Sequence, residues 1–464
     1  MRSATEIKEI ESLIRTITVS QPSAFSIRLK GAPPDHNIMA FLGRHYPELQ
    51  NILDCFIVST KIAWRYTPEL NATVVELSQV QYMDNQKIEL ILYVSGWTGF
   101  QKAHALARMA RCAHVAIIVE FHPEELASAQ GNIAQYLLDR LSQEMDSSEN
   151  LYGDPWEFSQ RRRTHEGSVW NSQFSPNRWI FCLNQYQFES YQIRIGLQTE
   201  ICKLNHSLFA NRNYTDREKV LVVDRWIRDN IEYLDEDNNA DHSAAVTLMR
   251  RKGVCQGVAA LVVAMLQLEN IPAIYIRGCF TDTSSHAWNM VRLDGRWLHL
   301  DCTWGQNYTG TDHPYLLRTD ETFPKHTWNH AIYGHEANEK RASSIERLNR
   351  HHFNFLLHEM RYTVDDTIVT CPRRAPMIEW GQQRMIDMVS LFRFLKLGYR
   401  QKDQQLCIYT RHRLFAFPIG RDDTQAPCQI LMKDNNLYIS VHALAQLPGV
   451  SVSAYAESVT VKTQ

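Results

Sequence analysis

Three residues near the middle of the chain have the types and spacing of a thiol nucleophile with its base. Cys255 lies in GVCQGVAAL, between two glycines and directly before an apolar run with helical spacing. A helix N-terminus presents free backbone N–H groups and the positive end of the helix dipole, and both stabilise a thiolate. A nucleophilic thiol also needs a base, and His286 and Asp301 follow downstream.

The two downstream residues belong to a predicted β-hairpin. Asp294-Gly295 lies between two apolar runs, which is a strong signal for a two-residue turn. With this turn, His286 and Asp301 become diagonal neighbours on the same face of the sheet. An imidazole in that position takes the thiol proton, and a carboxylate fixes the imidazole tautomer. The spacing therefore predicts Cys255 as the nucleophile, His286 as the base and Asp301 as the residue that orients the base.

Two alternatives remain open at this point. Cysteine is a common small buried residue, so a structural role for Cys255 is the simpler interpretation. His299 shares the predicted face of His286 and is the rival base, although it lies further from the strand end. We expect no metal and no cofactor, because no HExxH, zinc-finger, GxGxxG or Walker pattern occurs.

The elements that must position these residues follow from capping signals and apolar periodicity. Thr215 and Glu218 form a capping box that predicts one helix. Residues 243–251 predict a second helix with Gly253 as its left-handed terminator, and residues 255–268 predict a buried third helix.

Four segments are expected along the chain. Residues 1–145 predict an α+β N-terminal domain, and the polar, turn-rich residues 146–179 predict a linker. Residues 180–335 are the expected catalytic domain. Residues 336–464 predict an accessory domain with a helix from about residue 377 followed by short strands, so that this domain is small and β-rich.

The composition is that of a globular protein without a strong charge preference. The 464 residues include 49 Lys plus Arg and 51 Asp plus Glu, so the net charge of −2 gives no reason to expect nucleic acid as a partner. Uninterrupted apolar runs are too short for a membrane span, and the N-terminus lacks the pattern of a signal peptide. Ten scattered cysteines without a CxxC predict reduced thiols and a cytoplasmic location.

Three stretches resemble the transglutaminase-like superfamily, and more closely its microbial branch and its kyphoscoliosis-peptidase-like relatives. They are GVCQGVAAL at 253–261, SHAWNMVRLDGRWLHLDCTWG at 285–305 and PYLLRTDETFPKHTW at 314–328. The resemblance implies an α+β fold with a papain-like transglutaminase core, in which the nucleophile helix packs on an antiparallel sheet. Position by position, it implies the nucleophile at Cys255, the base at His286 and the orienting carboxylate at Asp301.

The resemblance also implies thiol acyl transfer on peptide or side-chain amides of a protein or peptide substrate, through a thioester. Hydrolysis is expected before amine transfer, because microbial members of the superfamily lean that way and the sequence shows no amine site. A true transglutaminase and a catalytically silent scaffold are the alternatives, and a protein partner is expected on the N- or C-terminal domain. The candidates for the substrate cleft are Gln256, Trp288, Tyr233 and Trp304, of which Tyr233 is also a candidate oxyanion donor.

Overall fold

The structure of the chain is a computed structural model that describes most of its residues. The described residues are 4–33, 37–82, 88–110, 112–129, 131–141, 166–172, 175–184, 191–210, 212–234, 243–281, 284–339, 342, 350–357, 359–372, 374–395, 397–410, 413–421 and 428–463. No helix within these ranges has the length and apolar character that a membrane crossing requires.

The predicted thiol helix and hairpin lie together in one α+β unit. Its sheet has five antiparallel strands in the order β13-β12-β11-β10-β14, and α10 packs on one face of the sheet. The expected helix-on-sheet core is therefore present. The strands are β10 (Ala273–Phe280), β11 (Ser284–Leu293), β12 (Arg296–Leu300), β13 (Leu316–Arg318) and β14 (His326–Trp328). The helices are α7 (Tyr191–Phe209), α8 (Asp216–Asn230), α9 (Ala244–Arg250), α10 (Cys255–Leu268), α11 (Cys302–Gly305) and α12 (His330–Tyr333).

The hairpin of β11 and β12 has the predicted register. Val291 pairs with Leu298, and both turn residues, Asp294 and Gly295, adopt positive φ angles of 49° and 75°. Such angles are those of a turn whose twist matches the flanking strands. One face of the hairpin packs apolar side chains against α10, and the opposite face carries aromatic side chains around Trp288. The sheet therefore has one face that packs on the thiol helix and one aromatic face.

Asn289 of β11 ties α10 to the sheet. Its buried Nδ2 donates to the carbonyl oxygen of Ala259 at 2.9 Å and to that of Ile274 at 3.4 Å. Ala259 lies about one helical turn beyond Cys255, so this contact fixes the start of α10 relative to β11. A buried amide without such partners would be costly, which makes the position of the helix specific.

A nine-stranded sheet joins the N- and C-terminal segments and crosses the predicted domain boundaries. Its order is β25-β26-β15-β16-β17-β4-β5-β7-β6. Its strands are β4 (Leu90–Ser95), β5 (His114–Glu120), β6 (Glu166–Asn171), β7 (Arg178–Asn184), β15 (His352–Leu356), β16 (Arg361–Val364), β17 (Thr367–Thr370), β25 (Val450–Ala454) and β26 (Ser458–Thr463). The predicted linker 146–179 thus needs correction, because β6 and the first residues of β7 lie within it. Its first part, residues 146–165, lies outside the described residues.

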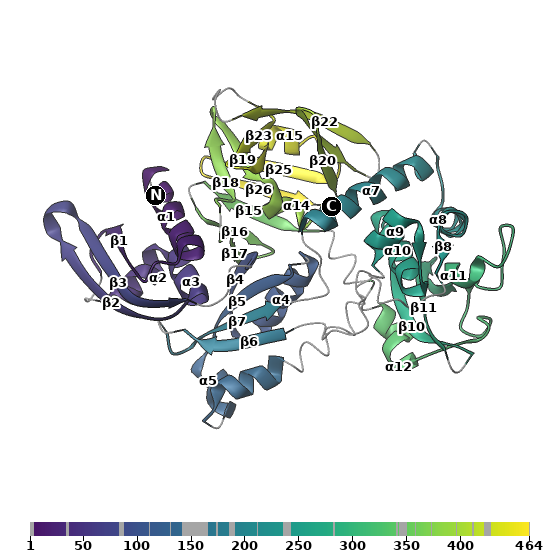
Figure 1. Ribbon diagram of the computed structural model, residues 1–464, viewed down its shortest axis with the longest axis horizontal. Helices are drawn as coiled ribbons and strands as arrows, with labels where there is room; N and C mark the ends of the chain where they lie inside the picture. The colour runs from purple at the N-terminus through teal and green to yellow at the C-terminus, as the bar shows by residue number, and fades with distance from the viewer. Residues whose placement is uncertain are drawn as a thin grey trace.

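Two further sheets complete the fold. Strands β1 (Ala24–Lys30), β3 (Ala72–Tyr82) and β2 (Ile57–Thr67) share a core with α1 (Ala4–Arg15), α2 (Ile38–His45) and α3 (Pro47–Phe56). The second is a seven-stranded sheet formed in the order β18 (Met377–Trp380), β19 (Gln383–Asp387), β24 (Asn436–Ser440), β23 (Ile430–Lys433), β22 (Leu414–Arg421), β21 (Gln405–Tyr409) and β20 (Gly398–Lys402). Figure 1 shows α8–α12 with β10 and β11 at one end of the molecule and α1–α3 with β1–β3 at the other.

The prediction of a helix from about residue 377 is wrong. Residues 377–387 form the β18–β19 hairpin, whose turn contains Gly381 and Gln382 with φ angles of 51° and 65°. Only α14 (Met388–Phe392) is helical there. Glutamine is uncommon in the left-handed region, so the second turn residue hid the turn signal in the sequence.

Gly278 allows β14 and Trp288 to approach β10, so a side chain at this position should destabilise the protein. A Cβ on Gly278 would lie 2.1 Å from the carbonyl oxygen of Thr327 and 2.5 Å from the Trp288 ring. We expect Gly278→Ala to lower the free energy of unfolding by about 1–3 kcal/mol in urea denaturation. Gly196→Ala in α7 is the control, because its new methyl group would meet no atom within 4 Å. Equal stability of both variants would contradict the described packing of β14.

Candidate active site

Cys255 is the first residue of α10, and the chain that leads to it is held by a short parallel pair of strands. β9 (Lys252–Gly253) pairs with β8 (Glu232–Tyr233). The predicted helix terminator needs correction, because the left-handed residue that caps α9 is Arg251, with a φ angle of 57°, and not Gly253. Gly253 instead permits close packing, since a Cβ there would lie 2.7 Å from the Thr247 hydroxyl.

The start of α10 presents its backbone donors beside the thiol. Its N-cap residue, Val254, makes no side-chain cap, and the first N–H groups of a helix have no partner within the helix. The Cys255 side chain is partly exposed. A thiol that reaches solvent at a positive helix end is the arrangement that the sequence predicts.

His286 and Asp301 are hydrogen-bonded to one another where β11 begins and β12 ends. His286 Nε2 lies 2.7 Å from Asp301 Oδ2, and both side chains are buried. The contact follows from the confirmed hairpin register. The His286 side chain also interacts with the Cys255 thiol, and because Nε2 binds Asp301, Nδ1 is the nitrogen left for the thiol.

The two partners shift one another's pKa in opposite directions. Burial lowers the pKa of His286, but hydrogen bonds with Asp301 and Cys255 outweigh burial and raise the pKa to about 9. Burial raises the pKa of Asp301, but hydrogen bonds from His286 and His326 lower it to about 2. At neutral pH the pair is an imidazolium and a carboxylate, and this imidazole is able to hold a proton taken from a thiol.

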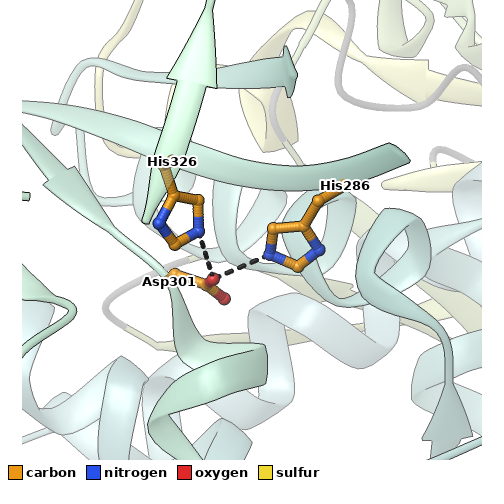
Figure 2. Close-up of side chains that lie close together, drawn as sticks. All are labelled: His286, Asp301 and His326. Carbon is orange, nitrogen blue, oxygen red and sulfur yellow. Dashed lines mark hydrogen bonds and ion pairs between the residues drawn. The ribbon is translucent and has the colours of Figure 1, made fainter. Parts of the chain in front are cut away.

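Asp301 uses its two carboxylate oxygens for different partners. Oδ1 accepts the backbone N–H groups of Thr303 at 2.8 Å and Trp304 at 3.2 Å, and so caps α11. Oδ2 accepts from His286 and also from His326 Nε2 at 3.1 Å. Figure 2 shows both imidazole rings directed at the same carboxylate.

His299, the rival base in the sequence, has its two ring nitrogens bonded elsewhere. The Trp288 indole N–H donates to His299 Nδ1 at 3.0 Å, so His299 Nε2 carries the proton and donates to Asp320 at 3.0 Å. Burial lowers the pKa of His299 to about 4. This histidine is therefore neutral and supports the aromatic face of the sheet.

Most of the other cysteines are buried, whereas Cys255 is partly exposed. All ten cysteines lie within the described ranges, none of them is in a disulfide, and only Cys279 and Cys428 are partly exposed like Cys255. Cys302 lies beside Asp301, but burial raises the pKa of its thiol well above the usual value. A buried thiol of this kind is a poor nucleophile.

The four predicted cleft residues have different environments. Trp288 does not line a cleft, because it is 1% exposed and lies behind His286 with its ring parallel to the imidazole. Trp304 is partly exposed, stacks on Phe280 and meets the His286 ring edge-on. Tyr233 is exposed on β8. Gln256 is buried, and its Oε1 has no hydrogen-bond partner among the described residues.

His326 is the residue that sequence reasoning left unassigned. It lies in the quoted stretch 314–328, but only the pairing of β14 with β10 brings it beside Asp301, and nothing local to the residue predicts that pairing. Within the described residues, His286, Asp301 and His326 are also the group that could hold a metal ion, with ligand atoms within 4.8 Å of one another. A metal there would have to replace the protons of the two hydrogen bonds to Oδ2.

Comparison with known proteins relates this region to one family. The sequence model of the Transglutaminase-like superfamily matches residues 204–302, which contain all three predicted site residues. Kyphoscoliosis peptidase of Homo sapiens is 29% identical over 146 residues, which cover 28% of this chain and 22% of that protein. Kyphoscoliosis peptidase of Mus musculus is 28% identical over 113 residues, which cover 21% of this chain and 17% of that protein. The match thus spans about a fifth of the length of these curated relatives.

One solved structure, that of a TGase, is also similar. It is 15% identical and aligns with a TM-score of 0.23 over 48% of this chain and 61% of that chain. The similarity to the Transglutaminase-like superfamily rests on the sequence match over residues 204–302.

The raised pKa of His286 should make stability fall as pH increases. This pKa rises from 6.5 to about 9 on folding, so the stabilisation is complete below pH 6.5 and is lost as the pH rises to about 9. The loss is on the order of 3 kcal/mol. Urea denaturation at the two ends of this range measures it. Asp301→Asn should flatten the dependence, and an equally steep dependence in that variant would contradict the described pair.

Proposed function

Because residues 204–302 match the model of the Transglutaminase-like superfamily, we propose that the chain is a thiol acyl-transfer enzyme that hydrolyses peptide or side-chain amides. Cys255 is the nucleophile, His286 the base and Asp301 the residue that orients the base. One observation carries the proposal: a buried His286–Asp301 pair contacts a partly exposed thiol at a helix start. Strongly shifted pKa values such as those of His286 and Asp301 cluster at functional sites.

The first half of the reaction forms a thioester. His286 Nδ1 holds the proton that comes from the Cys255 thiol, so that the two side chains react as a thiolate and an imidazolium, and the thiolate attacks the amide carbonyl carbon. The carbonyl oxygen gains negative charge, which the backbone N–H groups at the start of α10 stabilise. The carbon–nitrogen bond then breaks, and His286 returns its proton to the leaving amine or ammonia.

The second half releases the acyl group. A water molecule gives a proton to His286 and attacks the thioester, and the carbon–sulfur bond breaks to leave a carboxylic acid and the Cys255 thiol. Asp301 stabilises the imidazolium in both halves because its Oδ2 accepts the hydrogen bond from the Nε2–H group. A primary amine in place of water would give amine transfer by the same steps.

Substrate contacts come from residues around the thiol. Gln256 directly follows Cys255, and its buried Oε1 has no hydrogen-bond partner among the described residues. A buried amide oxygen without a partner is costly. We therefore assign Oε1 to accept a hydrogen bond from an N–H group of the bound substrate. Trp304 is the apolar wall next to His286. Tyr233 lies on the strand that pairs with the chain leading to Cys255, and we assign it to the rim of the site.

Cys255 should react faster with limiting iodoacetamide than any other cysteine at neutral pH. Its thiolate is stabilised by the helix start and by His286. Mass spectrometry of the labelled peptides measures the rates, and the partly exposed Cys279 and Cys428 are internal controls. His286→Ala should slow only the labelling of Cys255. Equal labelling of the three cysteines would contradict the assignment of the nucleophile.

Denatured casein with dansylcadaverine tests the reaction itself, because casein offers peptide bonds and glutamine side chains. We expect new N-termini or ammonia release without incorporation of the dansyl amine. Cys255→Ala and His286→Ala should each lower the rate by at least about 10³-fold, and the double variant should be little worse, because the residues act as a unit. Dansyl incorporation would instead indicate a transglutaminase. Turnover that survives Cys255→Ala would contradict the assignment of Cys255 as the nucleophile, and a wild-type protein without turnover would favour a scaffold.

A further inference from the structure

The site contains a third buried side chain that the mechanism above does not use. We infer that His326 is a positioning residue, which holds the Asp301 carboxylate so that Asp301 orients His286 during thiol acyl transfer. The inference rests on the proposed function and adds a fourth residue to its site. His326 acts through Asp301 and does not touch the substrate.

His326 is fixed by hydrogen bonds at both ends of its ring. Nε2 donates to Asp301 Oδ2 at 3.1 Å, and Nδ1 lies 2.7 Å from the carbonyl oxygen of Pro324. The Asp301 carboxylate has no proton to donate, so a flipped or rotated ring would lose its hydrogen bond to Oδ2. The side chain is fully buried, and water does not replace a lost partner easily at such a position.

The backbone that carries His326 is itself held in place from two sides. A turn closes where Thr322 N and Phe323 N both donate to the carbonyl oxygen of Thr319. The carbonyl oxygen of Lys325 accepts from Thr281 N at 2.8 Å, and β14 pairs His326 with Phe280 of β10. The ring position therefore follows from the sheet and the turn together.

His326 restricts Asp301 Oδ2, which is the carboxylate oxygen that binds the His286 imidazole. Oδ1 is already held by two backbone N–H groups of α11, whereas Oδ2 has only the two imidazoles as hydrogen-bond partners in the described residues. With His286 alone, the carboxylate and the catalytic imidazole would shift together. A second donor from a different strand fixes Oδ2, and small displacements of a catalytic group are costly in rate.

If His326 served only to pack against its neighbours, replacing it should have the same effect as replacing another buried, stacked histidine. The Phe323 ring lies between two histidines, at 4.1 Å from the His326 ring and 4.5 Å from the His299 ring. His299 bonds to Trp288 and Asp320 and forms no hydrogen bond or ion pair with Asp301 in the described residues. His299→Phe is therefore the matched control for the loss of a buried, stacked histidine.

The test is a double-mutant cycle with Asp301 in the full-length protein. The readout is the rate of alkylation of Cys255 by iodoacetamide, together with turnover of denatured casein. His326→Phe keeps a stacking ring and removes the Nε2 donor to Asp301. We expect it to lower both rates about 10- to 100-fold, to have little effect in an Asp301→Ala background, and to be partly rescued by His326→Gln, which keeps an N–H donor. The effect of His299→Phe should be independent of Asp301.

Three results would overturn the inference. If His326→Phe lowers the rates equally with and without Asp301, or if wild-type rates persist in His326→Phe, His326 does not act through Asp301. If EDTA abolishes wild-type activity and Zn²⁺ restores it, His326 is a metal ligand. The failure of the proposed function is distinguishable, because wild-type Cys255 would then alkylate no faster than Cys279.

Discussion

The buried carboxylate of Asp301 is the group on which the rest of the site depends. It accepts N–H groups from the backbone of Thr303 and Trp304 through one oxygen, and from His286 and His326 through the other. Burial of a carboxylate is unfavourable, and these four donors compensate for it. One side chain thus ends β12, begins α11 and sets the direction of the imidazole that faces Cys255.

The two faces of the five-stranded sheet have different roles. One face forms the apolar core with α10, and the other carries the aromatic side chains around the histidines. Val291 and other aliphatic residues of β11 and β12 pack against α10 on one face. The opposite face carries Phe280, Trp288 and Phe323 around the two histidines. An aromatic surrounding excludes water, and electrostatic interactions between the charged groups become stronger there. His286 and Cys255 meet where the start of β11 reaches the start of α10.

Local signals predicted the parts of the site that lie on neighbouring chain segments. Asp294-Gly295 specified a turn, and the turn specified which residues share a face, so the contact of His286 with Asp301 followed from the alternation of side chains. The apolar periodicity after Cys255 specified α10 in the same way. His299 had to be left open, because only the three-dimensional contacts with Trp288 and Asp320 remove it as a base.

The features that the sequence did not reveal depend on distant pairing or on unusual backbone angles. His326 reaches Asp301 because β14 pairs with β10, across a large separation in the chain. β6 was hidden inside a polar segment, and its place in the sheet comes from pairing with β7. Arg251 and Gln382 adopt left-handed backbone conformations that favour glycine or asparagine, so the end of α9 and the β18–β19 turn carried no clear signal.

The central claim is that one ionised carboxylate accepts hydrogen bonds from two imidazoles. Nuclear magnetic resonance of the protein with ¹⁵N-labelled histidine tests it directly, because a protonated ring nitrogen and a bare one have distinct shifts. At neutral pH the account predicts protons on Nε2 of both His286 and His326, each exchanging slowly, and a changed Nε2 environment in both rings in Asp301→Ala. A bare Nε2 on either ring in the wild-type protein would contradict the account.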